Sequence, residues 1–366
     1  PGEAHTNTAT AKGKSVFTGK EVTSTDPWNA ATAPENPSIS IIKFTASEGT
    51  EKGDRDNPAD PFEVSIEDQV AAALAGKPVS TKVDFKIKNT GDVPLVDAKL
   101  ADVVAKDSKG KMENLTCEVI DPADATKKVK VAGDKIASLA IGQEVDCTAN
   151  MTGLKPTEVH RDDATVTAKS LLSGKEVTAT DPWNAKAEKE TPFIDVVKFT
   201  LDEGIEKGDR NDPKSPFVIA IEKQVAAHGG TDKSLTKVAF QVTNKGDVPL
   251  KDVKLTDLTD DKTKGSVTNI VGVVQTPKLD ADGKPVLDEA GKPVMESKEI
   301  KGDTIGQLAV GQSVVLVGDL VGMAPNEIHK NTATAEGTSI LTGVKVSDED
   351  PWNANTAPEK PEIDVE

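Results

Sequence analysis

Asp26-Pro27-Trp28-Asn29-Ala30 decides the architecture of this chain, because the same five residues return at positions 181–185 and 350–354. Successive copies lie about 155 to 170 residues apart, which is far longer than a solenoid unit and typical of a self-contained domain. A second segment, Gly-Asp-Val-Pro-Leu, occurs at 91–95 and again at 246–250, so the repeat extends well beyond the tryptophan motif. The sequence therefore predicts a tandem array of similar domains.

The repeat also sets the expected domain boundaries. The segment Pro-Gly-Glu-Ala-His at 1–5 is similar to segments at 156–160 and 325–329, late in each repeat. We therefore expect the chain to open on the C-terminal part of one domain and to close on the first strand of another. The predicted segments are a C-terminal part with its linker (1–36), two complete domains (37–191 and 192–360) and the start of a further domain (361–366).

Within each complete domain, apolar and polar residues alternate as they do in a strand with one solvated face. Clusters of Asn, Gly and Pro at 89–94 and 244–249 have the composition of tight connections between strands. The predicted fold is all-β, with tandem Ig-like Greek-key β-sandwich domains in an elongated array. The residues predicted to face inward include Val83, Phe85 and Ile87, their counterparts Val238, Phe240 and Val242, and the run Ala164, Val166 and Ala168.

Two segments depart from this strand pattern. Residues 65–75 begin with a capping Ser65 and precede Gly76, which predicts a short helix in each domain, although the counterpart at 220–227 lacks the cap. An irregular crossover loop is the alternative. The second domain is also longer, because two similar stretches at 280–286 and 288–294 are predicted to extend one hairpin near 276–296.

Composition narrows the class of protein. The chain has 366 residues, a net charge of −17, 36% hydrophobic residues, three Trp and no Tyr, and it contains no membrane-spanning run or signal peptide. The excess of acidic residues would repel phosphate backbones, so nucleic acid is not an expected partner. A strongly acidic surface suits an extracellular or calcium-rich setting, but acidity that merely keeps a long exposed protein soluble explains it equally well.

Four short motifs follow one another in a fixed order along the repeats. They are Asn89 to Asp97, Leu139 to Gln143, Cys147 to Ala149, and Asn-Thr-Ala-Thr-Ala at 7–11 and 331–335. Taken together, they resemble the conserved Ig-like repeats of Gram-positive bacterial cell-surface adhesins. The resemblance covers both complete domains, although the first departs from the closing motif at 162–166. It implies stalk domains in an extracellular protein anchored to the cell wall, with neighbouring repeats as partners and no enzymatic activity.

The only two cysteines, Cys117 and Cys147, lie in one domain, where members of that family often carry a pair. The resemblance therefore implies a disulfide across one sandwich. The second domain has Gly272 and Leu316 in these positions and must fold without it. Two free thiols in a cytosolic protein are the alternative. No second Cys pair or Cys/His spacing suggests zinc.

Acidic loops after the first strand of each domain are the candidate metal sites. Carboxylate and amide oxygens two residues apart around a Gly can bind Ca²⁺, although the spacing is not that of an EF-hand and a solvated turn is the alternative. We expect each loop to meet the Asp of the preceding tryptophan motif at a domain junction, with Asp102 and Asp257 as further ligands. The predicted calcium ligands are Asp26 with Asp54, Asp56 and Asn57, Asp181 with Asp209, Asn211 and Asp212, and Asp350.

The repeated tryptophans have two interpretations. They could stack on sugars at a binding face, or they could form an apolar anchor that holds each Pro-rich linker against its own sandwich. The second interpretation is favoured, because all three precede such linkers, at 29–38, 184–193 and 353–362.

Lys43 and Lys198 interrupt apolar runs on the first strand of each domain, where a lysine could condense with Asn or Asp to form an isopeptide bond. The candidate partners are Asn150 and Asp319. An edge lysine whose stem is buried while its ammonium group reaches water is the alternative.

Neither the histidines nor the carboxylates suggest an enzyme. His5, His160 and His329 occupy one repeated position, and no nucleophile lies at a suggestive spacing from them. The sequence therefore favours a structural stalk. The alternatives are a module that binds host protein or glycan directly, with the hairpin at 280–294 as its contact surface, or a subunit of a surface filament.

Overall fold

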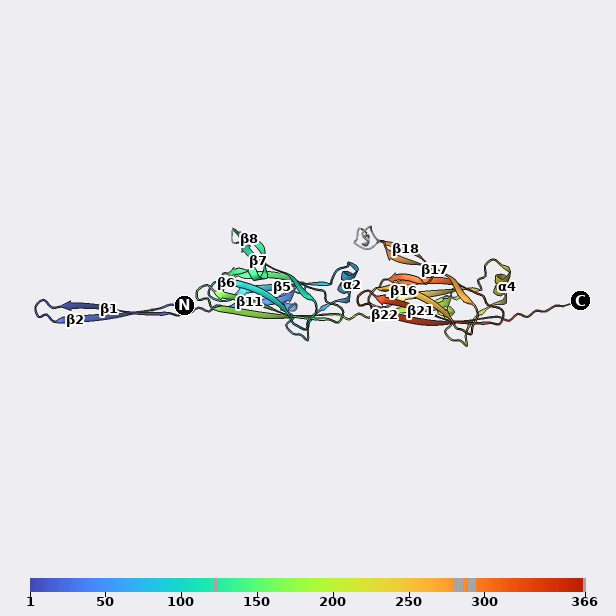
Figure 1. Ribbon diagram of the computed structural model, residues 1–366, viewed down its shortest axis with the longest axis horizontal. Coiled ribbons are helices and arrows are strands. Elements are labelled where there is room, and N and C mark those ends of the chain that lie inside the picture. The colour runs from blue at the N-terminus through green and yellow to red at the C-terminus, as the bar shows by residue number, and fades with distance from the viewer. Residues whose placement is uncertain (122–123, 279–285, 287, 289–293, 365–366) are drawn as a thin grey trace. The chain divides into compact units, whose positions relative to one another are not determined.

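The computed structural model describes residues 1–121, 124–278, 286, 288 and 294–364, and nearly all of its regular structure is strand (Figure 1). Contacts group the chain into two compact units. The first comprises residues 1–64 and 78–187, and the second comprises residues 65–77 and 188–366. The all-β prediction is confirmed. No helix among the described residues is long and apolar enough to span a membrane.

The first unit is a sandwich of two five-stranded sheets. One sheet has the order β3-β5-β10-β7-β8 and the other has the order β4-β12-β11-β6-β9. Neighbouring strands are antiparallel except for β4 and β12, which are parallel. The strands are β3 (Ile39–Thr45), β4 (Phe62–Val64), β5 (Ser80–Asn89), β6 (Leu95–Val104), β7 (Lys111–Asp121), β8 (Asp124–Ala132), β9 (Ala137–Leu139), β10 (Glu144–Thr152), β11 (Val159–Ser170) and β12 (Glu176–Ala187).

The second unit repeats this plan strand for strand. Its sheets have the orders β13-β15-β20-β17-β18 and β14-β22-β21-β16-β19, with β14 and β22 parallel. The strands are β13 (Ile194–Thr200), β14 (Phe217–Ile219), β15 (Thr236–Asn244), β16 (Leu250–Thr259), β17 (Ser266–Pro277), β18 (Met295–Lys301), β19 (Thr304–Leu308), β20 (Ser313–Val321), β21 (Ile328–Ser339) and β22 (Lys345–Thr356).

An exposed hairpin, β1 (Ala4–Lys14) with β2 (Glu21–Ala31), precedes the first sandwich. It has the register of the last hairpin of each sandwich, because Asn7 pairs with Trp28 as Asp162 pairs with Trp183 and Asn331 with Trp352. The sequence similarity of residues 1–36 to the end of a repeat is therefore matched by their backbone pairing.

The core consists of the side chains that point inward from the two sheets of each unit. The period-two prediction is confirmed, because Val83, Phe85 and Ile87 are fully buried, as are Val238, Phe240 and Val242. In the second unit these strands pack with Leu250, Leu255 and Leu316 in one continuous cluster. Burial of apolar area at about 25 cal/mol per Å² makes these residues the main source of stability of each sandwich.

Short helices occupy several of the connections between strands. The predicted helix is confirmed as α2 (Ile66–Leu74), in which Ser65 caps the N-terminus by accepting a hydrogen bond from the Asp68 amide. Its counterpart α4 (Ile221–Gly229) forms without a side-chain cap at Ala220. The remaining helical segments are α1 (Gly49–Lys52), α3 (Gly204–Gly208), η1 (Gly133–Lys135) and η2 (Leu201–Glu203).

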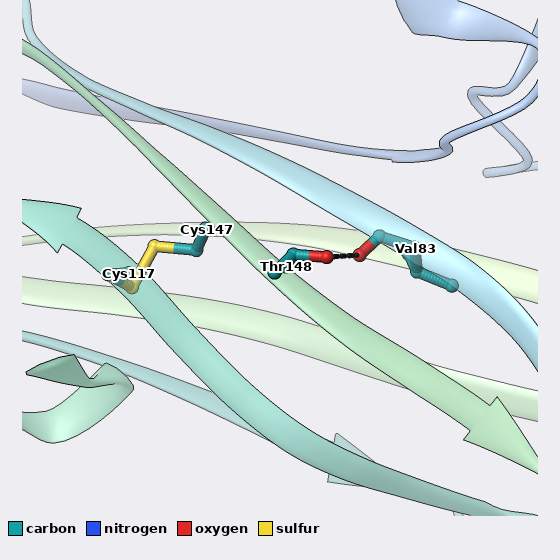
Figure 2. The surroundings of a disulfide bond; sticks show 4 residues. All are labelled: Val83, Cys117, Cys147 and Thr148. Carbon is teal, nitrogen blue, oxygen red and sulfur yellow. Dashed lines mark hydrogen bonds between the residues drawn. A yellow bond between two sulfur atoms is a disulfide. The ribbon is translucent and has the colours of Figure 1, made fainter. Parts of the chain in front are cut away.

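A disulfide joins Cys117 and Cys147, as predicted. The expectation that it would cross the sandwich is wrong. The two cysteines are opposite each other on the neighbouring strands β7 and β10 of one sheet, and the adjacent Thr148 reaches the Val83 carbonyl on β5 (Figure 2). Gly272 and Leu316 are paired in the same way on β17 and β20, so the second unit has no cross-link at this position.

The extra residues of the second unit lie between β17 and β18, which pair from Val271 with Lys301 to Pro277 with Met295. The predicted hairpin extension is therefore in the expected place. Most of the duplicated stretch at 280–294 lies outside the described residues.

The first and last strands of each sandwich run in the same direction, although they belong to different sheets. In the second unit, the Val196 amide donates to Asp348 and the Lys198 amide donates to Asp350, so both strands advance together. In the first unit, the Lys43 amide donates to Asp181, and Thr45 accepts from Trp183. The chain consequently enters each unit at one end and leaves it at the other.

Candidate functional site

The most unusual feature of the first unit is a lysine that lies wholly inside the sandwich. Lys43 projects from β3, and its side chain is 0% exposed. Its Nζ donates to both carboxylate oxygens of Asp102 on β6, each at 2.8 Å, and lies 2.5 Å from Asp162 Oδ2 on β11. One lysine of the first sheet is thus held between two aspartates of the second sheet.

The second unit contains the same arrangement with one substitution. Lys198 on β13 is also 0% exposed, and its Nζ donates to Asp257 Oδ1 on β16 at 2.7 Å. The position of Asp162 is occupied by Asn331 on β21, whose Nδ2 donates to the other oxygen of Asp257 at 2.6 Å. The Asp257 carboxylate therefore contacts the lysine amine and the asparagine carboxamide simultaneously.

Aromatic rings enclose the two lysine amines. Lys43 Nζ lies 5.2 Å from the centre of the Phe85 ring and 5.7 Å from that of Trp183. Lys198 Nζ has the equivalent contacts with Phe240, at 4.9 Å, and Trp352, at 5.4 Å. The rings stabilise a cation through their π faces and exclude water from it.

A buried histidine adjoins each cluster. His160 Nδ1 donates to the Lys109 carbonyl at 2.6 Å, and its Nε2 lies 3.1 Å from Asp162 Oδ2. His329 donates in the same way to the Lys264 carbonyl at 2.7 Å, and its Nε2 has no hydrogen-bond partner among the described residues. The repeated His position therefore lies beside the lysine cluster, two residues before Asp162 or Asn331 on the same strand.

Burial controls the protonation of these groups. It lowers the pKa of Lys198 to about 8, although the Asp257 carboxylate opposes this change. It raises the pKa of the Asp102 carboxyl against the influence of Lys43, and it lowers the pKa of His329. A lysine amine with a lowered pKa is more readily deprotonated to its nucleophilic form.

The structure corrects two expectations about the lysines. Neither ammonium group reaches solvent, so the interpretation as edge lysines is wrong. The candidate partners were also wrong, because Asp319 forms an ion pair with Lys237 at 2.7 Å, and Asn150 is paired in register with Lys82. Lys43 instead contacts Asp102 and Asp162, and Lys198 contacts Asp257, whose other oxygen accepts from Asn331. Asp102 and Asp257 are the residues that the sequence had suggested as additional metal ligands.

The predicted calcium ligands are grouped differently from the expectation. Asp181 lies close enough to Asp54 and Asp56 of its own unit for their charges to interact, whereas the sequence had paired it with the loop that follows. Asp350 is likewise close to Asp209 and accepts a hydrogen bond from Asn211. Asp26 lies on the exposed hairpin strand β2. The parallel direction of the first and last strands explains this grouping, because it brings each loop beside the closing strand of the same unit.

Several of these loop oxygens already stabilise turns. Asp54 accepts from the Asp56 amide and Asn57 from the Ala59 amide, while Asp209 and Asp212 accept from the Asn211 and Lys214 amides. Within the described ranges, no group of three or more His, Cys, Asp or Glu residues is arranged to hold a metal ion. Calcium binding therefore stays a prediction.

Trp183 and Trp352 are completely buried, so neither forms a platform on which a sugar could stack. The indole of Trp183 donates to Thr45 and that of Trp352 to the Gly208 carbonyl, each at 3.2 Å. Each tryptophan thus closes the lysine cluster of its own unit, a role that the sequence reasoning missed. Trp28, on the separate hairpin, is 58% exposed.

Chemically, each cluster combines a nucleophile, an acyl group and a carboxyl group in contact with the nucleophile. Lysine supplies the amine, Asp162 or Asn331 supplies the acyl carbon, and Asp102 or Asp257 can carry protons. Among the described residues, the Oδ1 atoms of both Asp162 and Asn331 are buried without a hydrogen-bond partner.

No protein-family model matches the chain, and no curated protein matches it. Solved structures similar to it include the C-terminal domain of the Streptococcus pyogenes antigen I/II-family protein AspA (10% identity, 86% of this chain and 99% of that chain, TM-score 0.27). They also include the C-terminal domain of the Streptococcus agalactiae AgI/II polypeptide BspA (11% identity, 87% and 100%, TM-score 0.24) and the class 5 fimbriae chaperone CfaA (9% identity, 82% and 97%, TM-score 0.19). TM-scores this low do not support a function for this chain.

Proposed function

We propose that this chain is a stalk segment of an extracellular bacterial surface adhesin, in which successive sandwiches hold a binding region away from the cell wall. The proposal assigns the chain a mechanical function and no catalytic turnover. The observation that carries it is the parallel direction of the first and last strands in each unit.

A stalk unit must pass the chain from one of its ends to the other. The Lys198 amide and Asp350 link β13 to β22 near the middle of both strands, and the paired contacts of Val196 and Asp348 fix their common direction. Tension applied through the chain would therefore load these strands in shear. Several contacts between them would have to break together, which resists extension better than opening them one at a time.

The linker before each unit is also fixed to that unit. Glu35 accepts from Ser170 at 2.7 Å and contacts Ser173, and Asp92 accepts from the Asn36 amide at 2.7 Å. In the second unit, Glu190 accepts from Ser339 at 2.7 Å and contacts Thr342, while Asp247 accepts from the Thr191 amide at 2.7 Å. These contacts and the linker prolines limit the freedom of the chain as it enters each sandwich.

Small-angle X-ray scattering of the whole chain tests the proposal. A stalk predicts an elongated particle whose maximum dimension is close to the combined lengths of its units and does not change with ionic strength. A compact particle, with the units folded against each other, would refute the stalk function.

Direct binding to a host protein or glycan is the alternative, and its best candidate surface is the extension between β17 and β18, which only the second unit contains. Deleting residues 280–293 tests it. Loss of adhesion to host cells with an unchanged melting curve would favour the binding module, whereas unchanged adhesion would favour the stalk.

A further inference from the structure

We propose that each sandwich closes an intramolecular isopeptide bond between its two sheets, joining Lys198 to Asn331 in the second unit and Lys43 to Asp162 in the first. This is a covalent modification of the chain by itself, and it does not depend on the stalk proposal.

The geometry of the second unit carries the inference furthest. Lys198 Nζ and Asn331 Nδ2 donate to the two oxygens of one carboxylate, at 2.7 and 2.6 Å. A nucleophile and the leaving nitrogen of an amide are therefore both in contact with Asp257. Such a bridging carboxyl group can accept a proton from the attacking amine and deliver one to the departing nitrogen.

In the second unit, the Nζ–Cγ bond forms and the Cγ–Nδ2 bond of Asn331 breaks. The reaction starts with five protons, three on the lysine ammonium group and two on the carboxamide. One ends on the new amide, one on Asp257 and three on the ammonia that leaves. No atom changes oxidation state, so neither an oxidant nor a reductant is needed.

In the first unit, Asp162 provides the acyl group. Lys43 Nζ is 2.5 Å from Asp162 Oδ2, while Asp102 accepts two hydrogen bonds from the same amine. Amide formation here releases water. One of the three ammonium protons stays on the new amide. Asp102 transfers the other two to the Asp162 oxygen that departs, which leaves as water. Asp102 is thus the equivalent of Asp257.

The surroundings favour the amide over the charged groups. A buried ion pair loses hydration that its mutual attraction only partly replaces, and a buried carboxylate oxygen without a partner adds to this cost. Among the residues that the structure describes, Asp162 Oδ1 has no partner of this kind, and condensation would replace both charges by one neutral amide. The enclosing rings of Phe85 and Trp183, or Phe240 and Trp352, exclude the bulk water that would compete as a nucleophile.

Both copies of the repeat contain the cluster. Lysine, the bridging aspartate and the acyl residue occupy corresponding positions on β3, β6 and β11 and on β13, β16 and β21. The Asn-to-Asp difference changes only the leaving group.

Intact-mass spectrometry of the whole chain, with its disulfide reduced, is the first test. Each bond removes about 17 Da (ammonia) or about 18 Da (water), so the parent chain should be about 35 Da lighter than its sequence. A deficit of only about 17 Da would overturn the bond in the first unit, and one of only about 18 Da would overturn the bond in the second. A mass equal to that of the sequence would overturn both.

Tryptic peptides give the same answer without any variant. Trypsin cannot cleave after an acylated lysine, so residues 190–207 should appear joined to residues 331–345, and residues 21–52 joined to residues 162–169. Linear peptides that end at Lys198 or Lys43 would show that the corresponding bond is absent.

Variants then assign the roles of the residues. Asp257→Asn retains both reacting groups but removes the proton carrier, so its deficit from the mass of its own sequence should fall from about 35 to about 18 Da, as should that of Lys198→Met. The matched control is Lys237→Met, which removes the surface ion pair with Asp319 and should leave the mass deficit unchanged. A full deficit in Asp257→Asn would refute the role of Asp257.

Discussion

At the scale of single residues, the cluster shows how a charged side chain can be kept inside an apolar sandwich. Lys198 is completely buried, but Asp257 and the faces of Phe240 and Trp352 compensate part of its lost hydration. Such a group is costly if any partner is removed, because the remaining charge is then buried alone. The cluster therefore fixes the relative position of the two sheets even before any covalent bond forms.

Asp350 gives a pH prediction at the same scale. Burial raises its pKa to about 6, although the Lys198 amide hydrogen bond opposes this. Below about pH 3 the carboxyl is protonated in the folded and unfolded states alike. As the pH rises to about 6, the carboxyl loses its proton in the unfolded chain before it does so in the folded chain. The contribution of Asp350 to the free energy of unfolding therefore falls over this range, and it stays constant at higher pH.

The Asp350→Asn variant keeps an acceptor for the Lys198 amide but cannot ionise. The difference in free energy of unfolding between this variant and the parent should be about 1 to 2 kcal/mol more favourable to the variant at pH 8 than at pH 4. Urea unfolding, with hydrogen exchange of β13, measures it. Asp319→Asn is the control of opposite sign, because Lys237 lowers the pKa of Asp319 and stabilises its charged form. A pH-independent effect of Asp350→Asn would contradict the prediction.

At the scale of elements, the sequence was sufficient to predict the buried face of a strand and the ends of a helix, because both depend on residues close together in the chain. The alternation around Phe85 predicted which face of β5 is buried, and Ser65 with Gly76 predicted the limits of α2. The sequence could not show which strands face each other across the sandwich. Asp162 lies far from Lys43 in the chain, and only the packing of β11 against β3 brings them together. The disulfide shows the same limit, because its pairing was predicted but its sheet was not.

The cap of α2 gives a prediction with a built-in comparison. Ser65→Ala removes the acceptor for the Asp68 amide and should cost about 1 kcal/mol of helix stability. Ala220→Ser should stabilise α4 by up to about the same amount, because α4 lacks this cap. Hydrogen exchange of 66–74 and 221–229 measures both effects. Equal exchange in each variant and its parent would exclude a contribution from the cap.

The disulfide should stabilise one unit only. Replacing Cys117 and Cys147 by Ala should lower the free energy of unfolding of the first unit by about 2 to 4 kcal/mol, since a closed loop restricts the unfolded chain. The second unit serves as the internal control, because Gly272 and Leu316 occupy the equivalent pair. A calorimetric scan should show one transition shifted and the other in place. A shift of both transitions would mean that the units do not unfold independently.

At the scale of the whole molecule, the same sandwich is built twice with different supplementary devices. Both units have the buried lysine cluster, whereas only the first has a disulfide and only the second has the extension between β17 and β18. The shared features lie at the centre of each sandwich, where packing tolerates little change. The disulfide and the extension lie on the strands β7 and β17 and their hairpins, and the one difference within the cluster is Asp162 against Asn331.

Calcium is tested on the whole chain. A ligand that binds the folded state raises stability by mass action, so the calcium prediction requires a higher melting temperature with added calcium and its reversal by a chelator. Asp56→Asn should weaken the rise, because burial and the charges of Asp54 and Asp181 raise the pKa of Asp56 to about 7, and a cation would relieve this repulsion. Equal melting temperatures with calcium and with the chelator would contradict the calcium prediction, and the loops would then be turns held by hydrogen bonds alone.

The position of the disulfide on β7 and β10 has a consequence for its chemistry under load. An isopeptide bond from β3 to β11 would transmit tension directly between these strands, and the loop of residues 44–161, which contains both cysteines, would remain slack. The proposed bond would thereby keep on the order of 40 nm of chain from being drawn out. Stretching a disulfide generally speeds its attack by thiols, but Cys117–Cys147 would carry no tension. Its lifetime in a reducing environment would then be the same in a pulled chain as in a resting one.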